Sequence, residues 1–333
     1  MHKRNQLETQ NWFQYLLTKK TKKSFLFNGF NIQTKKGYFV LKSNVSENQD
    51  QTKKVFGFKW NKTDTYNEGI NKNLSSWLKK KYKKEYFDKI LKKESIILDA
   101  GCGSALSARL LFGAKLKNVN YVGVDISNAI EIAKIELEKI KIKNVLFKCD
   151  LNNIPIKNQT IDLIFSEGVL HHLDNPFDGL FNIVKLLKKK GIIMFYVYKK
   201  KAPIREFSDK LIRQKLKKLS PKQSWDLLLP LTKLGNQLGK LDKKINIKDD
   251  IELLEIPKGK ISIQRLFYWY IFKIYYNKNV SLKEMQHVNF DWYSPINAST
   301  HTKLEVEGWC KKLNLKILNI TVDNAGITVI AKK

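Results

Sequence analysis

The clearest structural signal in this chain is Ser95-Ile96-Ile97-Leu98-Asp99-Ala100-Gly101-Cys102-Gly103-Ser104. The apolar residues at its start predict a buried strand over 95–99. The two glycines predict a tight turn, at which a ligand can approach the backbone closely. A helix is expected over 104–112, and its N-terminus favours a negative group such as a carboxylate. A strand, a glycine turn and a helix in this order indicate an α/β fold with a ligand site at the turn.

The chain after this stretch continues to alternate short apolar runs with amphipathic helices. Further strands are expected at residues 121–125, 145–149, 161–166 and 192–198. Between them we expect a helix capped by Ser127 and a helix that begins at Asn175-Pro176. This alternation predicts a parallel sheet covered on both faces. After a helix at 302–313, two β runs at 315–322 and 326–331 are joined by a turn so short that they must pair antiparallel.

Two regions depart from this rhythm. Residues 1–50 are polar and irregular, with β-like runs at 24–27 and 38–41, and predict a small hairpin-rich cap. An amphipathic helix is expected over 74–93. The second region indicates a helical insertion, with helices near 204–219, 221–240 and 262–277.

The composition is strongly basic. The chain has 333 residues, a formal net charge of +31 and 43% hydrophobic residues, which excludes a disordered chain. Only five of its 62 basic residues are arginine, the side chain that usually makes bidentate phosphate contacts. The lysine excess therefore indicates solvated helix faces and a compositional bias. A nucleic-acid or anionic-membrane footprint is the disfavoured alternative.

Three widely spaced cysteines, Cys102, Cys149 and Cys310, predict neither a disulfide framework nor a zinc site. They suit a reducing compartment, and we expect a cytoplasmic protein. Residues 1–20 lack the apolar core of a signal peptide. The most apolar long stretch, Ile261–Tyr276, contains Arg265 and Lys273 and is shorter than the roughly 20 residues that span a bilayer, so no membrane span is expected.

Polar or glycine residues end every expected strand, and parallel strands bring these ends to one edge of the sheet. They are Asp99 to Ser104, Asp125, Asp150-Leu151, Ser166-Glu167-Gly168 and Tyr198. Asp125 follows Gly103 by 22 residues, about where an acidic residue meets ribose hydroxyls. Leu106 stands where the dinucleotide pattern requires a third glycine, which argues against NAD.

These elements together resemble class I S-adenosylmethionine-dependent methyltransferases, of the small-molecule type 11-like group. Ile97 to Gly103 resembles their first motif, and residues 165–173, Phe-Ser-Glu-Gly-Val-Leu-His-His-Leu, resemble their fourth-strand motif. The resemblance implies an α/β fold: a three-layer Rossmann-like methyltransferase sheet of seven strands, the last antiparallel, with a helical insertion and a small N-terminal cap. We accordingly divide the chain into a β-hairpin-like cap (1–62), a methyltransferase domain (63–201 and 301–333) and an insertion expected to form a substrate lid (202–300).

The resemblance also implies the site residues, and no metal is among the expected groups. The expected S-adenosylmethionine-binding residues are Asp99, Gly101, Cys102, Gly103, Asp125, Ile126, Asp150, Leu151 and Ser166. His171 or His172 is the expected base that takes a proton from the acceptor, and Glu167, Asp291 and His301 are the candidates behind them. The alternative role of the two histidines is to shape the pocket or to bond the backbone.

Two further segments carry weaker resemblances. Val288 to Pro295 resembles a substrate-side segment of uncharacterised members, so Asp291 and Tyr293, together with His301, are expected at the substrate. Residues 24–62 resemble the leader of bacterial methyltransferases that begin with a zinc-ribbon-like module. No cysteine precedes Cys102, so zinc binding is not expected.

The leading hypothesis is methyl transfer from S-adenosylmethionine to a small-molecule acceptor such as a sugar, a lipid or another metabolite, by O- or N-methylation. The alternative is an RNA or protein methyltransferase that uses the basic surface. Against it, Ser166-Glu167-Gly168 lacks the Asn/Asp-Pro-Pro-aromatic signature of amino-group methylation in nucleic acids. A non-catalytic module that binds the cofactor and an NAD enzyme are further alternatives. The sequence carries no prediction of oligomeric state.

Overall fold

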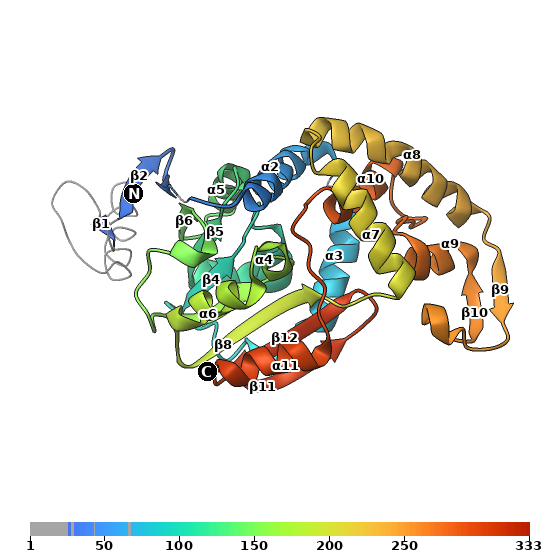
Figure 1. Cartoon of the computed structure of the whole chain (residues 1–333). Coiled ribbons are helices and arrows are strands. Elements are labelled where there is room, and N and C mark those ends of the chain that lie inside the picture. The colour runs from blue at the N-terminus through green and yellow to red at the C-terminus, as the bar shows by residue number, and fades with distance from the viewer. Residues whose placement is uncertain (1–25, 28–29, 43, 66–67) are drawn as a thin grey trace.

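A ten-stranded sheet forms the centre of the fold (Figure 1). The computed structural model describes residues 26–27, 30–42, 44–65 and 68–333 of the chain. In their order across the sheet, the strands are β1 (Leu26–Phe27), β2 (Phe30–Lys35), β3 (Tyr38–Leu41), β6 (Asn144–Lys148), β5 (Asn120–Asp125), β4 (Ile96–Ala100), β7 (Ile161–Ser166), β8 (Leu187–Tyr198), β12 (Gly326–Lys332) and β11 (Lys316–Val322). The chain winds outward from β4 to β6 and then, on the other side, from β7 to β8. The switch point between β4 and β7 is where such sheets bind ligands.

The predicted seven-strand sheet is confirmed as the order β6-β5-β4-β7-β8-β12-β11. β4 to β8 pair in parallel, and β12 pairs antiparallel with both β8 and β11. Three strands were not expected in this sheet, because the chain before residue 62 was assigned to a separate cap. β3 pairs in parallel with β6 at Phe39↔Phe147 and Val40↔Lys148. This pairing covers the backbone groups that β6 would otherwise leave open at the edge of the sheet.

Helices cover both faces of the sheet and produce three layers. α3 (Glu68–Lys81), α4 (Leu106–Phe112) and α5 (Ala129–Lys139) bury Leu78, Leu111 and Ile130 against one face. α6 (Pro176–Leu186) and α11 (Lys303–Lys312) pack against the other face. As predicted, Asn175 caps α6 by accepting from the backbone N–H groups of Phe177 and Asp178.

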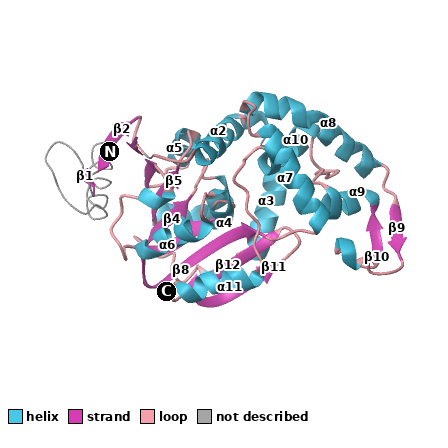
Figure 2. Cartoon of the chain, in the orientation of Figure 1, coloured by secondary structure: helices cyan, strands magenta, loops and turns pink. Residues whose placement is uncertain are grey.

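A group of helices follows the carboxyl end of β8 (Figure 2). This helical lobe consists of α7 (Pro203–Leu216), α8 (Pro221–Lys240), α9 (Ile263–Leu266), α10 (Leu282–Tyr293) and a small hairpin of β9 (Lys244–Ile247) and β10 (Gly259–Ser262). Phe290, Trp292 and Leu228 form its core together with Tyr196 and Tyr198 of β8. Within the described part of the chain, no helix combines the length and the apolar character needed to cross a membrane.

Two predicted helices end earlier than expected. α3 stops at Lys81 rather than near residue 93, and a 3-10 turn at Lys84–Tyr86 follows. This turn brings Phe87 into the core, where its ring meets Phe112 edge-on at 5.1 Å. The helix expected over 262–277 consists of α9 and one π-helical turn, Phe267–Ile271. Beyond it the backbone is extended, because side chains of α10 hold it there.

Two helices were not expected, although both carry readable N-caps. α2 (Glu47–Asn61) begins after Ser46, whose hydroxyl accepts from the backbone N–H of Gln49. α10 begins with a capping box between Ser281 and Glu284. Both helices line the cavity described next. The division into cap, methyltransferase domain and insertion stays a prediction.

Candidate active site

A cavity of about 450 Å³ lies at the carboxyl ends of β4 to β8. Gly101, Asp125, Asp150, Glu167 and Tyr198 line it from the sheet. Phe56, Lys59 and Trp60 of α2, Trp77 of α3, and His287 and Asp291 of α10 line it from the helices. The cavity therefore occupies the switch point of the sheet and is closed by the helical lobe and α2.

The structure brings eight of the fifteen predicted site residues to this cavity. They are Gly101, Asp125, Ile126, Asp150, Leu151, Glu167, His172 and Asp291. The other seven lie behind its wall or away from it: Asp99, Cys102, Gly103, Ser166, His171, Tyr293 and His301.

The glycine turn after β4 requires glycine on steric grounds. Gly101 has a φ of +83°, and a Cβ there would lie 2.4 Å from the side chain of Val169. Gly103 has a φ of +52°, and a Cβ there would lie 2.7 Å from the indole of Trp60. The missing side chains thus leave room on one side for the cavity wall and on the other for α2.

Asp125 ties the glycine turn to the end of β5. Its carboxylate accepts from the backbone N–H of Gly103 at 2.9 Å and from the backbone N–H and hydroxyl of Ser127 at 2.7 and 2.6 Å. Burial raises the pKa of Asp125, and the bonds from Ser127 and Gly103 oppose that rise. The carboxylate is oriented before any ligand arrives.

Three predicted cofactor residues support the turn from behind. The hydroxyl of Tyr121 donates to Asp99 at 2.6 Å, and burial raises the pKa of Asp99 to about 7. Ser166 is fully buried and donates to the backbone carbonyl of Ala100, which joins the ends of β7 and β4. Burial raises the pKa of the Cys102 thiol, so this side chain fills space as a neutral group.

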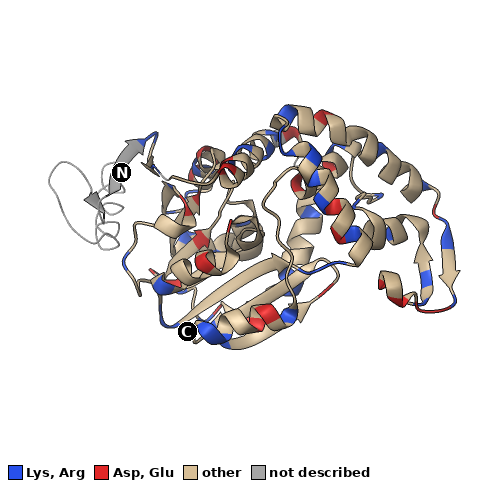
Figure 3. Cartoon of the chain, viewed as in Figure 1, with Lys and Arg blue, Asp and Glu red and all other residues tan. Residues whose placement is uncertain are grey.

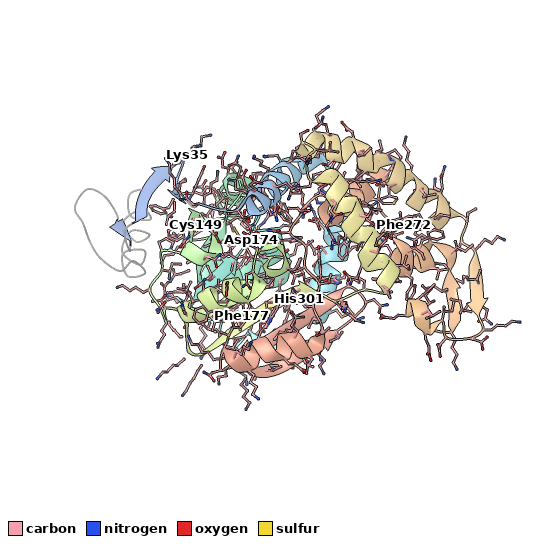
Figure 4. All side chains as sticks on the ribbon, viewed as in Figure 1. Lys35, Cys149, Asp174, Phe177, Phe272 and His301 are labelled. Atoms are coloured by element: carbon pink, nitrogen blue, oxygen red, sulfur yellow. The ribbon has the colours of Figure 1, made fainter. Side chains whose placement is uncertain are left out.

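The wall beside β6 combines apolar and acidic groups. Ile126, Leu151 and Cys149 line it together with Asp150 (Cys149 is labelled in Figure 4). Asp150 accepts from the backbone N–H of Asn152 at 2.9 Å, which fixes the carboxylate at the start of a 3-10 turn. Apolar side chains with one oriented acid suit the flat ring and the exocyclic amine of an adenine.

His172 lines the cavity in a fixed tautomer. Its Nδ1 lies 2.5 Å from the backbone carbonyl oxygen of Asn297, which can only accept, so Nδ1 carries the hydrogen. The second nitrogen, Nε2, is then the basic one. Burial lowers the pKa of His172 to about 4, so the ring is neutral at pH 7. His171 is fully buried and stacks on Tyr198 at 3.6 Å, away from the cavity.

Glu167 lines the cavity as a predominantly protonated acid. Burial raises its pKa to about 8, against the bond from the Tyr82 hydroxyl and the charge of Lys81. At neutral pH it is a hydrogen-bond donor rather than a base. Asp291 is the opposite case. Its carboxylate lies 2.5 Å from Nζ of Lys59, and although burial opposes ionisation, Lys59 and the two nearby histidines hold its pKa at about 2.

The other two predicted substrate residues do not reach the cavity. The hydroxyl of Tyr293 accepts from the backbone N–H of Lys273 at 2.6 Å inside the helical lobe. His301, labelled in Figure 4, lies between Ser299 and Glu305 and meets Trp309 edge-on. His301 is also a neighbour of the end of β8, since its backbone N–H donates to the carbonyl of Tyr198.

Sequence reasoning missed Lys59, Trp60, Lys273 and His287, all of which line the cavity. The N-cap signals of α2 and α10 could have placed Lys59 and His287 on helices. No local signal marks Lys273, because it follows an irregular π-helical turn. Outside the cavity, charged residues are spread along the helices that cover the sheet and along those of the helical lobe (Figure 3).

Comparison with known proteins agrees with this geometry. Residues 91–236 match the model of a family described as a methyltransferase domain. This chain contains a class I S-adenosylmethionine-dependent methyltransferase domain. The resemblance recognised in the sequence is thereby confirmed, and the family implies S-adenosylmethionine as its methyl donor.

Curated relatives of the methyltransferase domain match only in part. An uncharacterized protein of Methanocaldococcus jannaschii is 31% identical over 34% of this chain and 46% of the relative. Protein arginine N-methyltransferase 1 of Saccharomyces cerevisiae is 35% identical over 26% of this chain and 25% of the relative. The chain thus spans half or less of the length of the curated relatives it matches.

Solved structures give a similar picture. A methyltransferase of Aquifex aeolicus aligns with 78% of this chain and 97% of its own, at 14% identity and a TM-score of 0.39. A methyltransferase of Methanococcus maripaludis aligns with 88% and 96%, at 14% identity and a TM-score of 0.41. Because these TM-scores are below 0.5, the domain assignment rests on the family match and the strand order.

The methyltransferase domain fits its expected cofactor. Gly101 provides a cradle that a Cβ would fill, and Asp125 presents an oriented carboxylate to the same cavity. Leu151 and Ile126 form the apolar wall next to it. These residues are suited to hold a ribose, an adenine and a zwitterionic amino-acid arm.

Proposed function

We propose that this protein transfers a methyl group from S-adenosylmethionine to an oxygen or nitrogen of a small-molecule acceptor. One observation carries the proposal: a continuous cavity joins the cofactor residues Gly101, Asp125 and Asp150 to the polar groups His172 and Asp291. Its volume of about 450 Å³ falls within the roughly 300–1,000 Å³ of small-molecule sites. Three buried free cysteines fit the proposed cytoplasmic location.

The proposed division of labour follows from the site. S-adenosylmethionine supplies, when bound, an electrophilic methyl group and a good leaving group. The chain aligns the acceptor and excludes water, and α2 contributes to both by closing over the glycine turn through Trp60. Nε2 of His172 is the proposed acceptor of the proton, because the neutral ring has a free lone pair there.

The lining favours an acceptor with an apolar body. Phe56, Trp77, Tyr196 and Tyr198 contribute aromatic surface to the cavity. Asp291 is ionised and bonded to Lys59, so it orients a polar group of the acceptor better than it takes a proton. Glu167 is suited to donate a hydrogen bond.

Calorimetry with S-adenosylmethionine and with S-adenosylhomocysteine tests the proposal directly. We expect binding by the wild-type protein and a loss of at least about tenfold in affinity for Asp125→Ala, which removes a charge-assisted hydrogen-bond acceptor. Asp226→Ala is the matched control, because Asp226 is an exposed residue of α8. A folded wild-type protein that binds neither compound would overturn the proposal.

Once binding is established, incubation of the protein with S-adenosylmethionine and pools of metabolites should yield products heavier by one methyl group.

A further inference from the structure

We propose that the acceptor carries an anionic group, a carboxylate or a phosphate, which binds to Lys273. This inference rests on the proposed function, since it describes the acceptor side of the same cavity. It starts from the charges that surround one side chain of α10, Trp292.

Four buried cations surround the ring of Trp292. The charged groups of Lys201, Arg205, Arg213 and Lys273 lie 5.7, 5.1, 5.3 and 4.2 Å from its centroid. Each of these side chains belongs to a residue that is at least nine-tenths buried. Such a concentration of buried positive charge is costly unless anions or hydrogen-bond acceptors compensate it.

Three of the four cations have oxygen partners. Lys201 donates to the backbone carbonyls of Asn324 and Ala325, at 2.6 and 2.7 Å. Arg205 forms an ion pair with Asp209, and Arg213 donates to the carbonyl of Trp292. The nearby carboxylates are already bonded.

Those carboxylates leave no anion for the fourth cation. Asp209 also accepts from the indole N–H of Trp292, and Asp291 is paired with Lys59. Glu206 accepts from the backbone N–H of Lys201 and from the hydroxyl of Thr300.

Lys273 differs from the other three. Among the described residues, no hydrogen bond or ion pair to its Nζ is formed, and its contacts are with the rings of Trp292 and Tyr268. It lines the cavity, whereas Lys201, Arg205 and Arg213 do not. The ammonium group therefore lacks an anion among the described residues. Because Lys273 lines the cavity, we infer that an anion reaches it from there. Burial also lowers the pKa of Lys273 to about 7, and a bound anion would restore its charge.

The backbone around Lys273 is built to hold this position. Its N–H donates to the hydroxyl of Tyr293, and the N–H of Tyr275 donates to the side chain of Asn289 at 2.9 Å. The side chain of Gln264 donates to the carbonyl of Ile274 at 2.6 Å. Three side chains thus fix the extended segment 273–275, which follows Phe272 in Figure 4. Tyr293, expected at the substrate, acts here as a positioning residue for Lys273.

The test uses probes that differ in charge but share a phenyl ring, which suits the aromatic lining. Benzoate, phenyl phosphate and neutral benzamide are titrated by calorimetry into the full-length protein saturated with S-adenosylhomocysteine. We expect at least one anionic probe to bind about tenfold or more tighter than benzamide, as one charge-assisted hydrogen bond allows. Tighter binding of benzoate would indicate that the acceptor carries a carboxylate, and tighter binding of phenyl phosphate would indicate a phosphate.

Variants assign the preference to one side chain. Lys273→Met should remove it, and Lys273→Arg should retain it. Lys222→Met, at an exposed position of α8, is the control and should leave the preference unchanged. We expect Lys273→Met to fold at least as stably as the wild type, since it removes a buried charge. If it does not fold, Lys273→Gln, which also removes the charge, takes its place in the comparison.

Two outcomes overturn the inference: equal binding of charged and neutral probes by the wild type, or a preference that survives in Lys273→Met. Binding of S-adenosylhomocysteine is measured separately for each variant and should be unchanged. Failure of that binding contradicts the proposed function, whereas equal binding of the probes contradicts only the anionic acceptor.

Discussion

At the scale of single residues, this site depends on groups whose protonation differs from that in water. His172 stays neutral because it is buried, and Glu167 holds a proton because burial outweighs the bond from Tyr82. The segment after β7 thus presents two groups to the cavity: His172 as a neutral base, and Glu167 as an acid that can donate a hydrogen bond. Such pairs of groups with separated pKa values are typical of functional sites.

The depressed pKa of His172 predicts a loss of stability in acid. The folded protein binds the proton near pH 4 and the unfolded chain near 6.5, so the contribution is intact above 6.5 and is lost as pH falls toward 4. At pH 5 this linkage costs about 2 kcal/mol of unfolding free energy. His172→Gln should reduce the difference between urea unfolding at pH 7.5 and pH 5.0 by that amount. Lys222→Gln, at an exposed position, is the control and should show the same difference as the wild type. If His172→Gln also showed the wild-type difference, protonation of His172 would not be the cause of the loss of stability in acid.

The close packing of Val169 on Gly101 predicts that an added Cβ destabilises the fold through a clash. This cost can be separated from the cost of a side chain at a positive φ. Gly101→Ala combines a left-handed φ with a contact at 2.4 Å, whereas Gly113→Ala has a φ of +54° and no atom within 4 Å. We expect Gly113→Ala to cost about 1–3 kcal/mol of unfolding free energy and Gly101→Ala at least about 1–2 kcal/mol more. Urea unfolding measures both. Val169→Ala added to Gly101→Ala should recover part of the loss, and equal costs for the two glycines would contradict the clash.

How far the site could be predicted depends on how local each signal is. Asp125 and Asp150 end buried strands, and the sheet brings such ends together, so sequence alone placed both on the cavity. Lys273 lies in the helical lobe, and its position depends on side chains of α10 that are distant from it in the sequence. His301 and Tyr293 were chosen for chemistry and motif, but neither feature tells whether a side chain faces the cavity or the neighbouring backbone.

At the scale of elements, strands were predicted more accurately than the helices that close the cavity. The strands of the parallel sheet are continuous apolar runs because both of their faces are buried, and such runs are easy to recognise. α2 is polar for most of its length, and three of its four buried positions (Gln49, Thr52 and Lys59, beside Val55) are polar, so it shows little apolar periodicity. Its cap at Ser46 was the better signal.

The position of α2 over the glycine turn predicts that Trp60 contributes to the affinity for the cofactor. The indole lies against Gly103 and lines the cavity, so Trp60→Ala removes apolar surface that a bound ligand would share. We expect the affinity for S-adenosylhomocysteine to fall about tenfold, in line with the roughly 1.5–3 kcal/mol gained on burying a large side chain. Hydrogen exchange in residues 47–61 should slow on ligand binding in the wild type and less so in the variant. Phe181→Ala, half exposed on α6, should change neither result; an unchanged affinity of Trp60→Ala would exclude α2 as a cover.

At the scale of the whole molecule, the net charge of +31 and the cavity make different predictions about salt. Lys and Arg are distributed over the helices around the sheet and in the helical lobe (Figure 3). The cavity carries both signs, with Asp125 and Asp291 beside Lys59 and Lys273. Contacts between an exposed basic surface and a polyanion weaken steeply with salt. Groups inside a cavity are screened much less.

We therefore expect the affinity for S-adenosylhomocysteine to change less than about twofold between 50 and 500 mM salt, because that ligand is a zwitterion held away from bulk ions. Retention on heparin should be lost over the same range. Calorimetry and chromatography measure the two quantities side by side. A tight RNA complex that persists at 500 mM salt and is methylated would favour the alternative acceptor class.

The helical lobe leaves and rejoins the sheet through one narrow neck. Lys199 and His301 form a parallel bridge, and the backbone N–H of Lys200 donates to the carbonyl of His301 at 2.9 Å. The 101 positions between Lys200 and Thr302 therefore begin and end at neighbouring points, like an insertion at a single surface loop. A change in the length of this lobe therefore need not shift the register of β8 against β12, because the chain returns to the sheet where it left it.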